Sequence, residues 1–309
     1  MQTALLFLVF NRPDTTTLVF EKIRQVKPSR LYVASDGPRD GNNDDKKKVI
    51  KVREIATMVD WPCEVKTLFR DKNLGCKKGV STAITWFFEH EEQGIILEDD
   101  CVPNLDFFTF CEDLLDRYFK DERISTITGN NFQNGKWRGN ASYYFSKYNH
   151  CWGWATWRRS WKNYDGDIKF WPEWSNSKNW INFISNKVER RYWQNIFKRV
   201  HSGQIDSWAY PWTASVWYKK GLTITPNVNL VSNIGFGENA THTKSKKNKF
   251  FKLPLNNLGT LIYSKKVEKN IKADNWTFKY HYGGKNLYFP FNLIYFFRKI
   301  MIYLFKNKK

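Results

Sequence analysis

Cysteine is scarce in this chain of 309 residues, and the five cysteines that it has are scattered. No two of them have the CxxC spacing, so the sequence suggests neither a zinc knuckle nor a disulfide framework. Acidic side chains are outnumbered as well, with 30 Asp and Glu against 50 Lys and Arg, which gives a formal net charge of +20. We therefore expect a reducing, cytoplasmic environment and an anionic partner, which could be nucleic acid, an acidic membrane leaflet or a phosphorylated substrate.

The amino terminus lacks the features of a signal peptide. Its apolar run, residues 4–10, has no basic segment before it and no small-residue cleavage site after it. Asn11, Arg12 and Pro13 follow at once. We interpret the run as a first strand buried on both faces, because such strands are continuously apolar.

The carboxyl terminus lacks an apolar run long enough to cross a membrane. Residues 289–305 are strongly apolar, but Arg298 and Lys299 interrupt them before the ~20 residues that a span needs. We predict an interfacial helix that binds anionic lipid of the inner leaflet, which would make the protein peripheral on the cytoplasmic face of the membrane. A helix packed on the protein itself or on a partner subunit is the alternative.

Runs typical of buried strands alternate with amphipathic patterns typical of helices in the first part of the chain. The expected strands are 4–10, 31–34, 65–69 and 94–97. The expected helices are one capped by Asp14, one that spans 78–90 and one capped by Asn104. This alternation predicts an α/β fold with a mainly parallel sheet flanked by helices.

From about residue 124 the pattern becomes mixed. Short strand-like pieces and a dense Trp cluster occupy residues 151–217, with a helix near 186–201. We divide the chain into two halves of one domain, 1–123 and 124–245, and a basic, apolar helical tail, 246–309.

Polar clusters follow three of the expected strands: Asn11-Arg12, Ser35-Asp36-Gly37 and Glu98-Asp99-Asp100. In open α/β sheets, ligands bind beyond the carboxyl ends of the strands. Glu98, Asp99 and Asp100, here called the acidic triplet, would repel one another after a buried strand unless a cation or hydrogen bonds compensate them. Mg²⁺ or Mn²⁺ with oxygen ligands would provide that compensation.

A second acidic run, Asn43-Asp44-Asp45-Lys46, has only polar neighbours. We interpret it as a solvated loop without a functional role. The difference between the two runs is the buried strand that precedes the acidic triplet.

Three further positions are candidates from their place in the pattern. Asp36 could accept hydrogen bonds from a base or ribose, or it could be an ordinary turn residue. Arg12 could hold a phosphate or ribose, or it could pair with Asp36. Asn73 and Gly75 could form a tight loop whose backbone approaches a ligand.

These motifs, in this order, resemble those of GT-A-fold nucleotide-sugar glycosyltransferases. The resemblance is to bacterial surface-polysaccharide enzymes akin to the N-acetylglucosaminyltransferase I family, and it covers roughly residues 5–245. Its segments are Phe10-Asn-Arg-Pro13, Ala34-Ser-Asp-Gly37, Asn73-Leu-Gly75, Ile96-Leu-Glu-Asp-Asp-Cys-Val-Pro103 and Trp152-Gly-Trp-Ala-Thr-Trp-Arg158.

The resemblance implies a GT-A (Rossmann-like) fold whose first half, 1–123, binds a nucleotide-sugar donor. Asp100 would be the direct ligand of Mn²⁺ or Mg²⁺, and Glu98 and Asp99 would contact the donor sugar and ribose. Arg12 and Asp36 match the contacts on the uridine side. Asn73 and Gly75 would belong to the same donor site.

The second half would bind the acceptor. The resemblance implies that Asp206 is the catalytic base of an inverting reaction, with Asp165 and Asp167 as rivals for that role. Trp154 and Trp208 are expected to contact the acceptor sugar. His242 is either a further metal ligand or an ordinary loop histidine.

The sequence therefore predicts a metal-dependent, inverting transfer from a nucleoside-diphosphate sugar, with uridine as the expected nucleoside, to a hydroxyl of a cell-surface glycan or lipid-linked acceptor. A sugar-1-phosphate nucleotidyltransferase is the first alternative, but it should carry a Gly-rich basic loop after the first strand. A basic nucleic-acid-binding protein is the second, and no recognisable nucleic-acid-binding motif is present, so nucleic acid is not an expected partner. A carbohydrate-binding protein without catalysis would leave the acidic triplet without a purpose.

Overall fold

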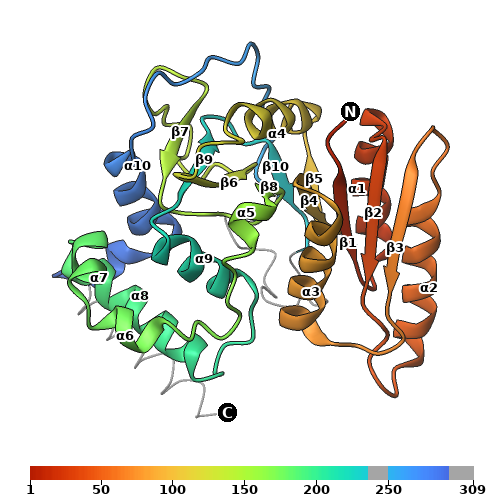
Figure 1. Ribbon diagram of the computed structural model, residues 1–309, viewed down its shortest axis with the longest axis horizontal. Coiled ribbons are helices and arrows are strands. Elements are labelled where there is room, and N and C mark those ends of the chain that lie inside the picture. Colours follow the sequence, from red (N-terminus) through yellow and green to blue (C-terminus); the bar gives the residue numbers. More distant parts are fainter. Residues whose placement is uncertain (236–249, 292–309) are drawn as a thin grey trace.

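The computed structural model describes residues 1–235 and 250–291. The first half alternates strands and helices as expected (Figure 1). Its elements are β1 (Leu5–Val9), α1 (Pro13–Val26), β2 (Arg30–Ser35), α2 (Asn43–Thr57), β3 (Glu64–Phe69), α3 (Gly75–His90), β4 (Gln93–Glu98), β5 (Cys101–Pro103) and α4 (Leu105–Arg117).

The second half adds shorter elements and a group of helices. They are β6 (Ile124–Thr128), β7 (Tyr143–Ser146), β8 (Trp154–Trp157), α5 (Arg158–Trp161), α6 (Trp171–Ser175), α7 (Lys178–Phe183), α8 (Lys187–His201), α9 (Ala209–Tyr218), β9 (Leu222–Pro226) and β10 (Val231–Asn233). A C-terminal segment follows, with α10 (Ile271–Trp276), a π-helical turn η1 (Thr277–His281) and a 3₁₀ turn η2 (Gly284–Leu287).

One sheet of eight strands joins the two halves, in the order β3-β2-β1-β4-β8-β6-β9-β7. Strands β3, β2, β1 and β4 are parallel to one another, and β6 is parallel to β9. Because β8 is antiparallel to both β4 and β6, and β7 is antiparallel to β9, only β7 and β8 run against the rest. The predicted α/β fold with a mainly parallel sheet flanked by helices is confirmed.

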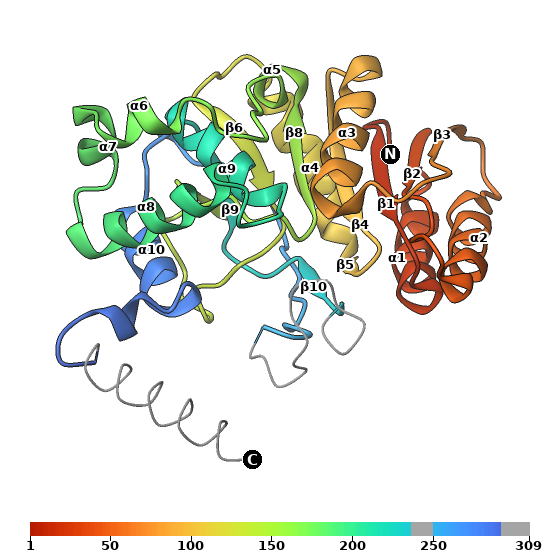
Figure 2. The same cartoon turned by 90° about the horizontal axis from the view of Figure 1, so that it is seen from below.

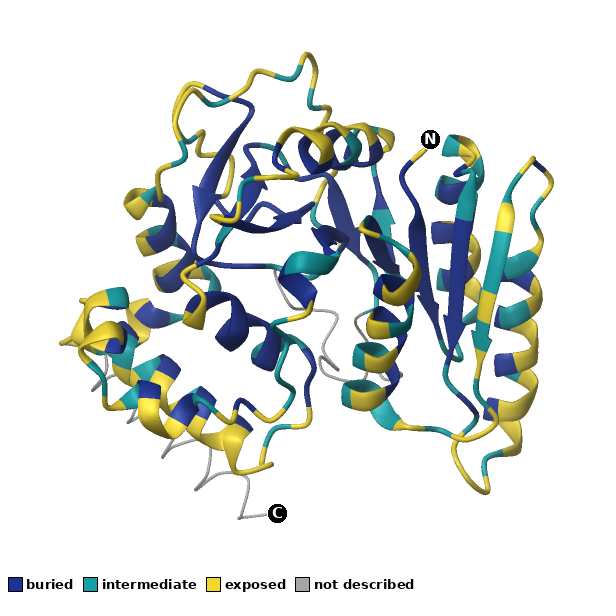
Figure 3. Ribbon diagram, in the orientation of Figure 1, coloured by how far each residue is buried: buried dark blue, intermediate teal, exposed yellow. Residues whose placement is uncertain are grey.

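Strand β1 shows why the sheet needs helices on both faces. All five of its residues are buried (Figure 3), and successive side chains point to opposite faces. Leu5, Phe7 and Val9 pack in a core with α1, α2 and α4, whereas Leu6 and Leu8 pack in a second core with α3, α8 and α9. A strand covered on both faces is therefore continuously apolar, as the sequence indicated.

Two predictions about helices in the first half need correction. Helix α1 begins at Pro13, so Arg12 and not Asp14 is the N-cap residue; Pro fits the first helical position because its fixed φ suits a helix and it needs no N–H partner there. The acidic run at residues 43–46 is also no loop, because it forms the first turn of α2, whose N-cap Asn42 accepts a hydrogen bond from Asp45 N.

The C-terminal segment packs on the second half of the chain. Ala273, Asp274 and Phe278 are buried, and Ser146 Oγ at the end of β7 donates a hydrogen bond of 2.6 Å to Asp274 Oδ1. The domain boundary at residue 246 stays a prediction. Within residues 1–235 and 250–291, no helix is long and apolar enough to span a membrane.

Candidate donor and metal site

The acidic triplet lies at the carboxyl end of β4, in the middle of the sheet. Glu98 is the last residue of β4 and pairs with Leu8 of β1. It therefore lies beside the carboxyl end of β1. Asp99 and Asp100 form the turn between β4 and β5. The short strand β5 pairs with β10, and Figure 2 shows these two strands side by side.

Arg12, which follows β1, forms ion pairs with two carboxylates of the acidic triplet. Its Nη1 lies 2.6 Å from Asp100 Oδ2 and 3.7 Å from Asp99 Oδ1. The backbone N–H of Phe10 donates to Asp99 Oδ2 at 3.2 Å. Of the alternatives for Arg12, pairing with Asp36 is therefore excluded in this structure, since the guanidinium is bound to the triplet.

The second oxygen of Asp100 is held from the β10 side. Asn233 Nδ2 and Cys101 Sγ donate to Asp100 Oδ1 at 3.2 and 3.3 Å. Gly235 then passes so close that a Cβ on it would lie 1.8 Å from Asp100 Oδ2 and 2.7 Å from Arg12 Nη1. Only glycine fits at this position without displacing the ion pair.

Burial and mutual repulsion control the protonation of the triplet. Burial, followed by the charges of Asp100 and Asp99, raises the pKa of Glu98 to about 8. Burial also raises the pKa of Asp99 to about 6, although Arg12 acts in the opposite direction. Burial opposes the charge of Arg12 itself, but the neighbouring carboxylates raise its pKa above the usual value. The site thus holds more negative charge than its single arginine compensates.

A divalent cation fits this site only together with a ligand. Among the described residues, no group of three or more His, Cys, Asp and Glu side chains is arranged to hold a metal. Glu98 makes no hydrogen bond or ion pair within that part of the chain, and Asp100 shares its oxygens with Arg12, Asn233 and Cys101. Mg²⁺ commonly binds through one or two carboxylates plus substrate phosphates and water, and Glu98 and Asp100 suit that arrangement.

Asp36, Asn73 and Gly75 form a second cluster at the start of α3. The carboxylate of Asp36 accepts hydrogen bonds from the backbone N–H groups of Gly37, Leu74 and Gly75, at 2.9 to 3.1 Å. Asn73 Nδ2 donates to Gly37 O at 2.8 Å, which ties the loops after β2 and β3 together. Gly75 has a φ of +78°, which suits glycine. The loop is tight, and Asp36 accepts from the backbone N–H groups at the start of α3. The approach of this loop to a ligand stays a prediction.

Asp206 lies in the segment between α8 and α9 and is exposed. Its carboxylate makes no hydrogen bond or ion pair within residues 1–235 and 250–291. Burial and then the charges of Glu98 and Asp206 raise the pKa of the Cys76 thiol to about 12, so this thiol lies within electrostatic reach of both carboxylates. Asp206 therefore borders the same region as the triplet.

Asp165 and Asp167, the other candidates for the catalytic base, both have partners within the protein. Asp165 accepts from the backbone N–H groups of Asp167 and Lys169, at 3.0 and 2.7 Å. Asp167 pairs with Lys77 at 3.0 Å. Each of these carboxylates already has partners, whereas that of Asp206 has none among the described residues.

The two tryptophans expected at the acceptor lie in the core. Trp154 and Trp208 are 1% and 3% exposed, and their rings stack with centroids 5.6 Å apart. We correct that prediction, because indoles buried against each other present no face to a sugar. His242 lies outside the described residues.

Asp45, to which the sequence analysis assigned no role, is buried and binds Arg39 and Asn11 beside the candidate site. It is 2% exposed, and it binds Arg39 through Nε and Nη2 at 2.5 and 2.8 Å. Asn11 Nδ2 also donates to Asp45 Oδ1 at 2.7 Å. Asp45 thereby fixes the residue before Arg12, and the interpretation of residues 43–46 as a solvated loop is wrong.

Sequence reasoning also missed Asn233, Gly235, Cys76 and Cys151 at the site. Burial raises the pKa of the Cys151 thiol, and the charges of Glu98 and Asp100 raise it further, so Cys151 lies near the triplet too. Cys76 directly follows the Asn73–Gly75 motif, and Cys151 directly precedes the motif that begins at Trp152. Their position next to these motifs is the one sequence signal that could have identified them. Asn233 and Gly235 have no local signal, since only the β5–β10 pairing brings them to Asp100.

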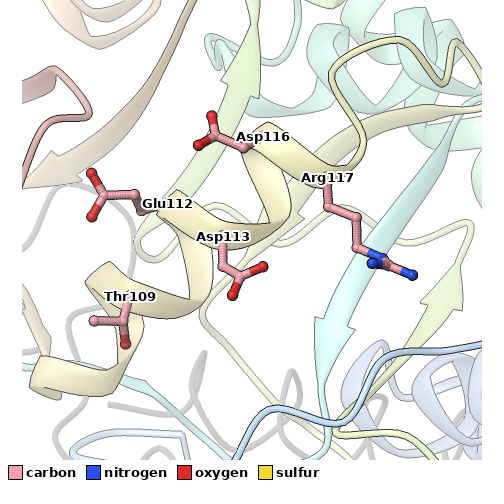
Figure 4. Close-up of a pocket in the computed structure, with 5 residues that line it drawn as sticks. All are labelled: Thr109, Glu112, Asp113, Asp116 and Arg117. Atoms are coloured by element: carbon pink, nitrogen blue, oxygen red, sulfur yellow. The ribbon is translucent and has the colours of Figure 1, made fainter.

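A shallow surface depression on α4 is separate from this site. Figure 4 shows its lining on one side of the helix: Thr109, Glu112, Asp113, Asp116 and Arg117. Glu112 accepts hydrogen bonds from the backbone of Gln2 and Thr3, just before β1. The depression therefore lies at the amino ends of the strands, away from the triplet, and its acids tie α4 to its neighbours.

Solved structures with some similarity share little sequence with this chain. HddC from Yersinia pseudotuberculosis is 12% identical, with a TM-score of 0.31, over 56% of this chain and 86% of that chain. An apo UDP-glucose pyrophosphorylase is 9% identical, with a TM-score of 0.37, over 73% and 90% of the two chains. A CMP:2-keto-3-deoxy-manno-octonic acid synthetase complexed with CTP is 11% identical, with a TM-score of 0.37, over 73% and 89%.

TM-scores this low decide nothing about activity. No protein-family model and no curated protein matches the chain. The site is therefore interpreted from its own residues.

Proposed function

We propose that this protein is a metal-dependent glycosyltransferase that moves a sugar from a nucleoside-diphosphate donor, with uridine as the expected nucleoside, to a hydroxyl of a glycan or lipid-linked acceptor. The observation that carries the proposal is the acidic triplet at the carboxyl end of β4, held against a single, partly buried arginine. Ligands of open α/β sheets bind at this edge.

The charge of the site favours a cation bound together with phosphates. Three carboxylates face one guanidinium, so a further positive charge is needed to offset their repulsion. A donor diphosphate needs positive charge as well. Asp100 and Glu98 would hold Mg²⁺ or Mn²⁺, which when bound would stabilise the leaving diphosphate as a Lewis acid.

Arg12 would bind the donor phosphates. Its Nε is buried and has no hydrogen-bond partner among the described residues, so one donor remains for a ligand. Guanidinium groups suit phosphate because their donors are planar and fixed in geometry. Asn11 and Asp45 hold the backbone from which Arg12 projects.

Asp206 would act as the base. An inverting transfer needs a carboxylate that removes the proton of the acceptor hydroxyl as that oxygen attacks the sugar. Asp206 is exposed and lacks a partner in the described part of the chain, in contrast to Asp165 and Asp167. These properties support Asp206 over its rivals.

A sugar-1-phosphate nucleotidyltransferase is the second candidate, and two of the similar structures are named as a UDP-glucose pyrophosphorylase and a CMP:2-keto-3-deoxy-manno-octonic acid synthetase. Such an enzyme should wrap a nucleoside triphosphate with a Gly-rich loop after the first strand. Here Phe10, Asn11 and Arg12 alone separate β1 from α1. That short connection favours a diphosphate-sugar donor over a triphosphate.

One assay separates the two candidates. The full chain with Mn²⁺ is incubated with a panel of nucleotide sugars, and in parallel with nucleoside triphosphates and sugar 1-phosphates. We expect slow release of nucleoside diphosphate from one nucleotide sugar and no release of pyrophosphate in the parallel reactions. Pyrophosphate release without any nucleoside diphosphate would establish the nucleotidyltransferase instead.

Two substitutions test the assigned residues. Asp100→Asn should abolish Mn²⁺-dependent donor binding in calorimetry, whereas Asp44→Asn, an exposed acid of α2, should leave it unchanged. Asp206→Asn should keep donor binding but reduce transfer at least 100-fold, in the range expected for loss of a general base. Donor binding by Asp100→Asn at the wild-type level would refute the metal assignment.

A further inference from the structure

The C-terminal segment carries an exposed face rich in aromatic and basic side chains. We call it the aromatic face, and it comprises Lys136, Trp137, Trp276, Lys279, Tyr280, Lys285, Phe289 and Phe291. It combines one side of α10 and η1 with the loop before β7 and with the residues after η2.

Helix geometry and loop contacts build the first part of the aromatic face. Trp276 and Tyr280 are four residues apart, so they lie on one side of the helical segment, with ring centroids 4.0 Å apart. Lys136 Nζ lies 4.8 Å from the centroid of the Trp276 ring. Trp137, the next residue, is 51% exposed.

The residues after η2 continue the same surface. Lys279 Nζ lies 6.0 Å from the ring centroid of Tyr288, which connects the helical part to this segment. Phe289 is 79% exposed, and Lys285 Nζ lies 5.1 Å from the ring centroid of Phe291. Two large apolar side chains, Phe289 and Phe291, are thus exposed in close succession, with a lysine beside Phe291.

The opposite side of the segment is anchored. Asp274 is buried and accepts from Ser146, while Gln133 Nε2 donates to Ala273 O and Thr277 Oγ1, at 3.2 and 2.9 Å. Trp276 Nε1 donates to Phe132 O at 3.2 Å. The part of the aromatic face on α10 and η1 is therefore a fixed outer surface of the folded domain.

Charge on this surface has one sign. Among residues 265–291 there are six lysines but only two acids, and one of these, Asp274, is buried. The other, Glu268, lies 3.9 Å from Lys266. Trp and Tyr favour the headgroup level of a bilayer, and lysines beside them are attracted to anionic lipid.

We propose that the aromatic face docks on the surface of an anionic membrane. The aromatic rings would lie at headgroup depth and the lysines against lipid phosphates, as in interfacial segments. In the sequence, the apolar and basic residues 292–309 leave the described structure at Phe291, within this same face. The inference concerns location and does not depend on sugar transfer.

Vesicle binding of the full chain tests the proposal without any donor. The probe is phosphatidylcholine vesicles with or without 30 mol% phosphatidylglycerol, in cosedimentation. Lys279→Glu/Lys285→Glu changes the face and leaves the tail intact. Lys46→Glu/Lys47→Glu, on exposed positions of α2, changes the net charge equally and serves as the control.

We expect the face variant to bind anionic vesicles at least tenfold more weakly than wild type, and the α2 variant to bind within twofold of it. Vesicles containing brominated lipid should quench wild-type fluorescence more than that of Trp137→Phe, because Trp137 would contact lipid. Equal losses in both charge variants would overturn the proposal, since they indicate diffuse attraction.

Three other outcomes also count against it. Wild-type binding by the face variant would show that the tail acts alone. Equal quenching of wild type and Trp137→Phe would remove Trp137 from the lipid. Binding of a soluble anionic polysaccharide without any binding to vesicles would identify a glycan as the occupant.

Discussion

Arg12 is the residue on which the candidate site depends. Its guanidinium sits 2.6 Å from Asp100, in the place where a metal ion bound to that carboxylate would exert its charge. The arginine thus offsets part of the repulsion within the triplet when no ligand is present. In a complex with donor and metal, Asp100 would bind the metal and Arg12 the phosphates, so this ion pair would have to separate.

Replacing Arg12 should separate metal binding from donor binding. In Arg12→Gln, the carboxylates lose their opposite charge, so Mn²⁺ affinity without donor should rise about tenfold, the size of effect that a neighbouring charge commonly has on a carboxylate. Affinity for a nucleoside diphosphate should fall. Electron paramagnetic resonance measures free Mn²⁺, and calorimetry measures the nucleotide. Arg123→Gln, in an exposed pair with Asp121, is the control; weaker Mn²⁺ binding in Arg12→Gln would contradict the interpretation.

Asp45 gives a prediction about pH. Hydrogen bonds from Arg39 lower the pKa of Asp45 to about 2, against an ordinary value near 3.8. A lowered folded-state pKa adds stability above the ordinary value, and this stability is lost as the pH falls from about 4 to 2. Asp45→Asn should therefore lower the free energy of unfolding by about 1–2 kcal/mol at pH 7, discounted for the exposed Arg39, and by almost nothing near pH 2.

Urea unfolding at several pH values measures this difference. Asp44→Asn is the matched control, because Asp44 is 68% exposed and pairs with Lys48 one helical turn away. A difference between wild type and Asp45→Asn that stays constant from pH 7 to 2 would disprove the role of the ion pair.

The two neighbours also show where sequence reasoning stops. Asp44 and Asp45 have the same composition around them, and only the fold brings Arg39 and Asn11 to one of them. Pairing partners far apart in the chain cannot be seen without the fold. The burial of Trp154 and Trp208 was missed for the same reason, since each is covered by the other.

At the scale of elements, the first half was predictable because its signals are strong. Strand β1 is continuously apolar, β4 has an apolar run at 95–97, and α4 has both Asn104 as N-cap and a clear apolar side. Helix α2 was missed because its sequence is mostly polar and its apolar positions are few. The short strand β10 has three residues and no distinguishing pattern, so its pairing with β5 could not be foreseen.

The pairing of β10 with β5 gives a prediction for Gly235. Gly235→Ala should displace Asp100 or Arg12, because its Cβ would overlap Asp100 Oδ2 at 1.8 Å. We expect Mn²⁺-dependent nucleotide binding to weaken at least tenfold in calorimetry, with little change in circular dichroism. Gly166→Ala has only ordinary contacts at 3.5 Å and should bind as wild type. Unchanged binding by Gly235→Ala would show that the segment after β10 can shift to accommodate the added methyl group without disturbing the ion pair.

At the scale of the whole molecule, a buried ionic network joins the second half to the C-terminal segment. Lys147 Nζ lies 2.6 Å from Glu189 on α8, and Tyr148 also donates to this carboxylate. The next residue before Lys147, Ser146, binds Asp274 of α10. Four parts of the chain, β7, α8, the segment after β7 and α10, thus depend on a few buried charges.

Breaking this network should destabilise these parts together. Glu189→Gln leaves Lys147 buried without its counter-ion, and such losses cost about 3 kcal/mol or more. Calorimetry should show a lower Tm, and hydrogen exchange should accelerate jointly in 143–148, 187–201 and 271–281. Glu268→Gln, in an exposed pair, should change neither. Faster exchange confined to α8 would mean that the parts unfold independently.

The position of β8 between β4 and β6 has a consequence for synthesis of the chain. Strands β1 to β4 are complete once residue 98 has left the ribosome, but the free edge of β4 is covered only by residues 154–157. At about 5–20 residues per second, roughly 55 further residues take several seconds to be made. During that interval an apolar strand edge is available for pairing with other chains, which is the usual route to aggregation. The nascent first half is therefore expected to need chaperone protection until β8 has been synthesised and can pair with β4.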